Sequence, residues 1–184
     1  MNKLIFIILL LLSVGTQGQV NLDDLPRRVS KSVQKTFDAH DILLDEISGT
    51  NPQNDNEQKF FRVKSAHQPA PKGYLHIGRV KTCRAGGCGS PSNYDETNAS
   101  EYFDYFILFD EKLIVKNIRI FNYQASHGHE ITARGWLKQF WGFNGRDTLK
   151  VGKDIDGISG ATISVYAITS DVQYKNEKLK ELIN

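Results

Sequence analysis

The 184-residue sequence lacks the patterns that mark most common classes of enzyme and binding protein. It contains no Ser-His-Asp order, no pair of catalytic carboxylates and no nucleotide-binding fingerprint, so we expect no catalytic residues. Internal repeats, low-complexity runs and basic tracts are also missing. The 23 basic and 21 acidic residues give a formal net charge of +2. We therefore expect neither nucleic acid nor strong membrane binding.

Cysteine is scarce, and the two that occur, Cys83 and Cys88, lie close together. They match neither the Cys-x-x-Cys-His of a c-type haem nor the four-ligand pattern of a zinc site. Between them, Gly86 and Gly87 make ring closure sterically easy. In an oxidising compartment we expect a disulfide that acts as a local clip and contributes at most ~2 kcal/mol. A redox-active pair and a metal site are the alternatives.

A short, continuous apolar run lies near the N-terminus. Lys3 precedes the apolar run Leu4–Leu12, and small residues follow at Thr16 and Gly18. The run is too short to cross a bilayer, and the whole pattern is that of a secretory signal peptide cleaved before Gln19. We expect residues 1–18 to be removed and the protein to be periplasmic or extracellular. A retained membrane anchor is the alternative.

Hydrophobic periodicity in the rest of the chain predicts one domain over residues 19–184. Apolar residues at four-residue steps predict an amphipathic helix over about 22–47. Residues 131–141 and 163–183 also have a helical pattern, and in the first of these we expect Phe140 and Trp141 to anchor the helix in the core.

Four further segments have the composition and alternation of strands: 60–66, 74–82, 102–109 and 112–121. Only Asp110 and Glu111 separate the last two, which is the length of a tight hairpin turn. The order of elements predicts an α+β fold with a mostly antiparallel sheet flanked by helices.

Residues 156–162 read Asp-Gly-Ile-Ser-Gly-Ala-Thr and directly precede the last predicted helix. The two glycines allow a tight turn and close approach to a ligand, and Ser159 and Thr162 offer hydroxyls near the helix start. The free amides and a partial charge of roughly +0.5 at a helix N-terminus favour an anion there. A glycine-containing loop with a Ser or Thr cap is the alternative interpretation.

This heptad resembles the Asp-Gly-x-Ser/Thr-Gly-Ala-Thr/Ser motif of the FMN-binding domain family. The family includes peripheral subunits of the sodium-translocating NADH:quinone reductase and of the Rnf complex, as well as exported proteins. The resemblance implies that Thr162 carries FMN through a phosphoester bond, made by a flavin transferase that takes the FMN unit from FAD. It also implies that Asp156, Ser159, Gly160 and Ala161 lie in the cofactor-binding loop. Asp156 could orient the loop, place the metal used by the transferase, or simply stabilise a turn.

A second segment, residues 126–136, resembles the looser Glu-Thr-Pro-Gly-Leu-Gly motif of the same family. Glu130 matches the Glu, and Thr132 matches the Thr after one inserted residue, whereas the Pro is absent. The resemblance implies that Glu130 and Thr132 contact the flavin ring, and Trp136 could cover an apolar ring face. Metal binding by His127 and His129 with Glu130 is an alternative that the spacing does not favour. The resemblance covers about residues 73–174 and implies an FMN-binding domain-like fold.

Together these observations predict an exported flavoprotein that carries electrons between unidentified redox partner proteins through FMN attached to Thr162. We expect no metal site. Two alternatives remain open. One is a flavin-dependent reductase with its own small substrate, for which Arg134 or His127 would be the binding group. The other is an exported ligand-binding module that has kept the fold without a flavin.

Overall fold

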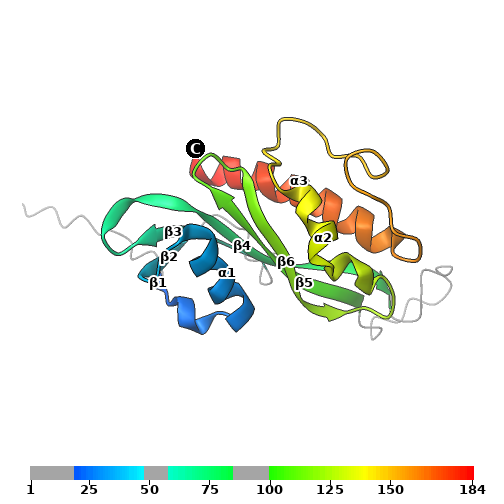
Figure 1. Cartoon of the computed structure of the whole chain (residues 1–184), viewed down its shortest axis with the longest axis horizontal. Coiled ribbons are helices and arrows are strands. Elements are labelled where there is room, and N and C mark those ends of the chain that lie inside the picture. Colours follow the sequence, from blue (N-terminus) through cyan, green and yellow to red (C-terminus); the bar gives the residue numbers. More distant parts are fainter. Residues whose placement is uncertain (1–18, 48–57, 85–99) are drawn as a thin grey trace, which may run out of the picture.

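The computed structural model describes residues 19–47, 58–84 and 100–184 (Figure 1). The predicted signal peptide, residues 1–18, lies outside them, and so does Cys88 of the predicted disulfide. In the described part of the chain, no helix is both long enough and apolar enough to cross a membrane.

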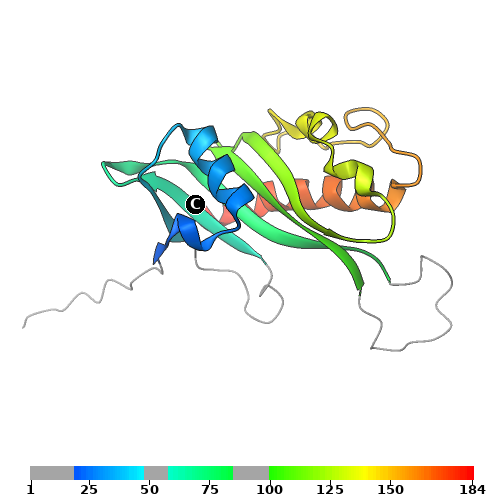
Figure 2. The same cartoon turned by 60° about the horizontal axis from the view of Figure 1, so that its bottom comes forward.

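Six strands form one antiparallel sheet in which each strand pairs with the next along the chain (Figure 2). The strands are β1 (Gln19–Val20), β2 (Ile42–Glu46), β3 (Lys59–Ser65), β4 (Gln68–Arg84), β5 (Ser100–Asp110) and β6 (Val115–Gln124). The helices follow or precede these strands and pack on the sheet. The predicted α+β fold, with an antiparallel sheet flanked by helices, is confirmed.

Strand β5, which pairs with β4 and with the edge strand β6, is buried on both faces. Every residue from Tyr105 to Phe109 has no exposed surface, which explains the continuous apolar run in the sequence. Successive side chains of a strand point to opposite faces. Phe106 and Leu108 accordingly pack in one hydrophobic cluster, while Tyr105, Ile107 and Phe109 pack in the other.

The two clusters place the two long helices on opposite faces of the sheet. Helix α1 (Arg27–Phe37) buries Val29 and Val33 in the cluster of Phe106. Helix α3 (Thr162–Ile183) buries the apolar side of its first five turns in the cluster of Ile107. Figure 1 shows α1 in blue and α3 in orange to red on different sides of the strands.

A buried polar contact also ties α3 to β5. The Tyr105 hydroxyl donates a hydrogen bond to the Asp171 carboxylate, and Lys175 Nζ lies 3.7 Å from the same carboxylate. Burial raises the pKa of both Tyr105 and Asp171. The contact fixes the rotation of α3 about its axis, because buried polar groups must keep their partners.

The predicted helix over 22–47 is too long. The structure has a short turn, η1 (Leu22–Asp24), and then α1, which ends where Asp38 adopts a left-handed φ of +46°. Residues Ile42–Glu46 form β2 instead. Buried and half-buried side chains alternate at its start, and this two-residue period fits a strand paired with β3.

The turn between β5 and β6 is also longer than predicted. Four residues, from Glu111 to Ile114, separate the strands, and Leu113 adopts a φ of +62°. The Asp110 carboxylate accepts hydrogen bonds from the backbone amides of Lys112 and Ile114 at 3.0 and 2.9 Å. This side-chain bonding stabilises a wider turn than the two-residue hairpin that the spacing suggested.

The predicted short helix at 131–141 is a chain of three short turns: η2 (His129–Thr132), α2 (Arg134–Leu137) and η3 (Lys138–Phe140). Phe140 is fully buried, as predicted, but Trp141 is not a core residue, since 48% of its surface is exposed. The helix has already ended at Phe140, so Trp141 extends from the turn, where Lys138 Nζ lies 5.4 Å from its ring centre.

We predict that the β5 core dominates the stability of the domain. Ile107→Ala should lower the free energy of unfolding by about 2–5 kcal/mol, because it removes buried methyl groups and leaves a cavity between the sheet and α3. The matched change Ile163→Ala, at a residue that is 43% exposed, should cost less than about 1 kcal/mol. Urea unfolding measures both. If both variants lost the same free energy of unfolding, the result would contradict the burial of β5.

Candidate functional site

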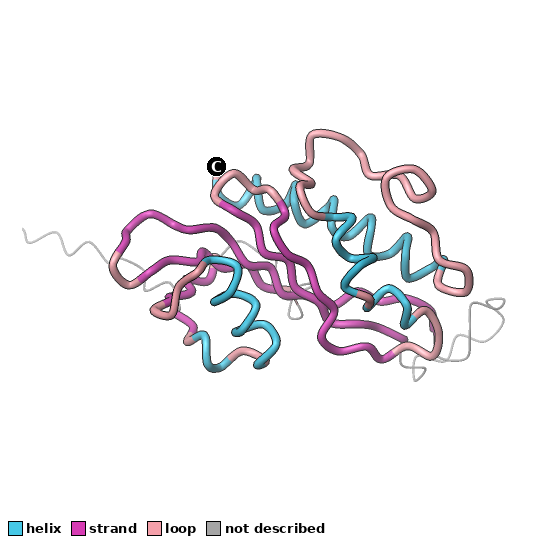
Figure 3. The backbone as a smooth tube through the Cα atoms, viewed as in Figure 1, coloured by secondary structure: helices cyan, strands magenta, loops and turns pink. Residues whose placement is uncertain are grey.

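The heptad 156–162 is an exposed loop that leads directly into α3. It ends the long connection after η3, which Figure 3 shows as a pink segment reaching the start of the helix. The Ala161 amide donates to the Ile158 carbonyl at 3.1 Å, so the loop closes in a tight turn. Gly160 lies inside this turn with a φ of +80°, a conformation that favours glycine.

The N-terminus of α3 has no side-chain cap. The capping residue is Ala161, and the first backbone hydrogen bond of the helix runs from the Val165 amide to the Ala161 carbonyl at 2.9 Å. The alternative of a Ser or Thr cap is therefore wrong. Because the first amides of a helix have no acceptor one turn earlier, the amides of Thr162, Ile163 and Ser164 are available to an anion.

The space around the loop is open where a ligand would approach. A methyl group added at Gly160 would meet no atom within 4 Å, and one added at Gly157 would touch only the Val151 side chain, at 4.0 Å. Ser159 and Thr162 are both exposed. Thr162 is the first residue of α3 and stands at the mouth of the uncapped helix end.

The second segment packs against the same helix end. Gly128 has a φ of +85°, and a Cβ there would lie 2.9 Å from the Ser164 hydroxyl and 3.4 Å from the Ala161 Cα. The Tyr123 hydroxyl, at the end of β6, donates to the His127 carbonyl at 2.6 Å and lies 3.2 Å from the Ser164 hydroxyl. The two motifs, distant in the sequence, therefore share one contact.

Tyr123 is a site residue that sequence reasoning missed. Burial raises its pKa, and hydrogen bonding to Ser164 opposes that shift. The phenol therefore stays protonated and can donate. The His129 ring packs edge-on against it at 5.4 Å between ring centres. Its position at the end of a strand, just before the second motif, was the signal available in the sequence.

Trp136 joins the second segment to the beginning of the heptad. Its indole Nε1 donates to the Asp156 carbonyl at 2.9 Å, and the Asp156 amide donates to the Gln139 side-chain oxygen at 2.8 Å. The Trp136 ring also packs edge-on against the buried Phe140. Trp136 thus positions the loop backbone, and Gln139 does the same although no sequence pattern pointed to it.

The remaining predicted residues lie on or beside η2. Glu130 is exposed, and Thr132 is half-buried and lines a groove on the side of α1. His127 and Arg134, the binding groups of the alternative reductase, are both exposed, and Arg134 lines the same groove. Among the described residues, no three His, Cys, Asp or Glu side chains gather as metal ligands do.

Comparison with known protein families gives a match in this part of the chain. The model of the FMN-binding domain matches residues 101–175, which begin in β5, include both motifs and end in α3. No curated protein and no solved structure gives a significant match. Residues 101–175 of this chain are therefore similar to the FMN-binding domain family, and this match supports FMN as the cofactor.

Proposed function

We propose that the protein is an exported electron carrier whose FMN is attached to the Thr162 hydroxyl through a phosphoester bond. The observation that carries the proposal is the position of Thr162. It is the exposed first residue of a long helix whose N-terminus no side chain caps. An FMN phosphate esterified there would lie beside the free amides of the first turn and the positive end of the helix dipole.

The residues at this end of the domain fit the cofactor. Ala161 offers no side-chain oxygen that would compete for the amides, and Gly160 leaves open space beside the phosphate. Glu130 and Thr132 supply an acceptor and a hydroxyl suited to the pyrimidine edge of the flavin. Trp136, whose indole donates to the Asp156 carbonyl, would pack on an apolar part of the ring.

Tyr166 is a further candidate for ring packing. It follows Thr162 by four residues on α3, so both side chains lie on one face of the helix. It is also one of the most exposed large side chains of the described residues, at 54%. An exposed aromatic residue one turn from the proposed attachment point would gain buried surface by covering the flavin.

When bound, FMN supplies the redox chemistry, and the protein sets its hydrogen bonding and its exposure to water. The chain's own residues hold the tether and orient the ring. Because the attachment loop is exposed, a partner protein could approach the flavin directly, as a carrier requires. The sequence contains no catalytic group that would add a substrate reaction, so we favour a carrier over a reductase.

Export would give the covalent bond its purpose. The N-terminal sequence has the pattern expected of a cleavable signal peptide, which supports export. Outside the cytoplasm a lost flavin is not readily replaced, and a tether keeps the cofactor at high effective concentration in every redox state. The proposal requires a flavin transferase that cleaves the pyrophosphate of FAD, transfers FMN to Thr162 and releases AMP, and it requires redox partner proteins.

We expect co-expression with a flavin transferase to add the mass of one FMN less one water to the wild-type protein. Thr162→Ala should abolish this adduct, because the acceptor hydroxyl is gone, whereas Ser159→Ala should retain it. Intact-mass measurement and flavin fluorescence after acid precipitation report the outcome. An adduct of unchanged yield on the Thr162→Ala protein would refute the assignment.

Gly128→Ala should reduce the extent of flavin attachment. Its methyl group would collide with the Ser164 and Tyr123 hydroxyls and push the second segment away from α3. Gly142→Ala is the matched control, since Gly142 has nearly the same φ, +86°, but no neighbour within 4 Å of an added methyl group. Both changes carry a backbone strain of about 1–3 kcal/mol. At a temperature where both variants are folded, only Gly128→Ala should lower the flavin content well below that of wild type. Equal flavin content in the Gly128→Ala and Gly142→Ala proteins would contradict the shared contact.

A further inference from the structure

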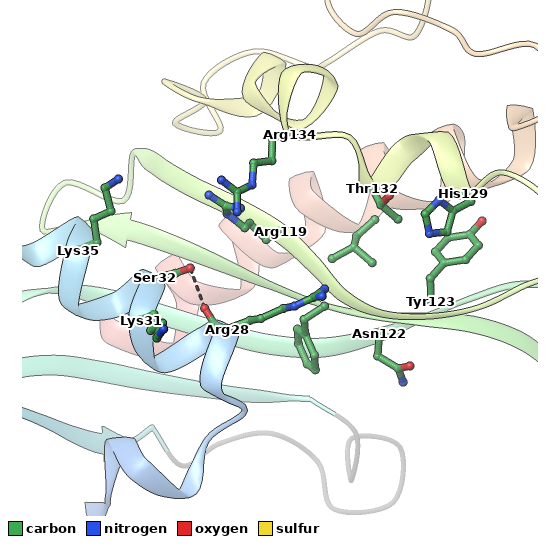
Figure 4. Close-up of a pocket in the computed structure, with 12 residues that line it drawn as sticks. Arg28, Lys31, Ser32, Lys35, Arg119, Asn122, Tyr123, His129, Thr132 and Arg134 are labelled. Atoms are coloured by element: carbon green, nitrogen blue, oxygen red, sulfur yellow. Dashed lines mark hydrogen bonds between the residues drawn. The ribbon is translucent and has the colours of Figure 1, made fainter.

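A groove of about 680 Å³ lies between α1 and β6, away from the heptad. One wall is the outer side of α1, the floor is β6, and the other wall is formed by η2 and the start of α2 (Figure 4). Its volume is in the range of small-molecule sites. No residue of 156–162 lines it, so it is separate from the proposed attachment loop, although Tyr123 and, from the neighbouring second segment, His129 and Thr132 border it.

The groove is strongly basic. Five cationic side chains line it, together with His129, and no Asp or Glu does. The five are Arg28, Lys31, Lys35, Arg119 and Arg134. Within the described ranges, none of them forms an ion pair with a carboxylate. Positive charge is therefore concentrated here in a protein with nearly equal numbers of basic and acidic residues.

Three elements, α1, β6 and α2, present these charges to the same space. On α1, Arg28, Lys31 and Lys35 follow one another at steps of three and four residues, which places them on one face of the helix. Figure 4 shows the guanidinium groups of Arg119 and Arg134 close together. Burial, and then the charges of Arg134 and Arg28, lower the pKa of Arg119.

Such a gathering of like charges is unfavourable unless an anion neutralises it. The groove also offers what an organic anion needs besides charge. Ile120 and Phe121 form an apolar part of the lining, and Ser32 and Asn122 add neutral hydrogen-bonding groups. The guanidinium groups can bind phosphate or carboxylate oxygens in pairs.

We propose that this groove binds a small anion that carries two or more phosphate or carboxylate groups. A compact ligand suits the groove better than a flat anionic surface, because Arg119 is half-buried between the walls, where a flat surface would not reach it. The site goes beyond the proposed electron carrier: it concerns a second ligand, and it does not depend on flavin at Thr162.

Isothermal titration of the mature protein with tripolyphosphate and, separately, with citrate tests the proposal. We expect saturable binding of one anion per chain, weakened as salt is raised. The phosphate and carboxylate titrations show which group the site prefers. The triple variant Arg28→Gln, Lys31→Gln, Lys35→Gln should bind the anion at least roughly tenfold more weakly than wild type. Arg119→Gln should show a similar loss of affinity. Circular dichroism confirms that each variant is folded.

The control is a second triple variant with the same loss of charge outside the groove: Lys81→Gln, Lys112→Gln and Arg146→Gln. All three residues are exposed, and none lines the groove. This protein should bind the anion nearly as well as wild type. An equal loss of affinity in control and groove variants would show that net charge alone attracts the anion, and it would overturn the site.

Two further measurements separate this site from the flavin and from membranes. Thr162→Ala should bind tripolyphosphate as wild type does, so the anion site would survive a failure of the proposed flavin attachment. Loss of anion binding once FMN is attached would show that the groove is part of the flavin site, and would overturn the proposal. Binding to phosphatidylserine vesicles without binding to either free anion would overturn it as well.

Discussion

The close contact between Gly128 and the first turn of α3 is the constraint on which the site depends. With no side chain at Gly128, the second segment comes within contact distance of Ser164 and Ala161, and the Tyr123 hydroxyl closes the contact. Trp136 then holds the start of the heptad from the other side. The loop that carries Thr162 is exposed, yet both of its ends are fixed, which is the arrangement that a tethered cofactor requires.

The sheet makes this contact possible. Because β5 is buried on both faces, α1 and α3 must cover opposite faces, and the chain leaves the sheet at the end of β6 beside the start of α3. The same geometry creates the basic groove on the α1 side of β6. One strand end therefore separates two regions of different chemistry: an uncapped helix terminus with open space, and a cleft lined by cations.

The sequence predicted those elements whose signal is local. The apolar run of β5 and the pattern of the last helix allowed the α+β fold to be deduced, and the heptad indicated the family. Ile42–Glu46 was misread because its three consecutive apolar residues fit the period of a helix as well as that of a strand. Its pairing with β3 makes it a strand. Tyr123 and Gln139 were missed since their roles depend on partners that lie 41 and 17 residues away in the sequence.

Peptide mapping of the protein isolated from its own host tests the central claim most directly. Trypsin should release the segment 154–175, which contains the whole heptad and the first turns of α3. The account predicts that tandem mass spectrometry finds this peptide with FMN esterified to Thr162. Recovery of the peptide with an unmodified Thr162, from a host whose flavin transferase is active, would contradict it.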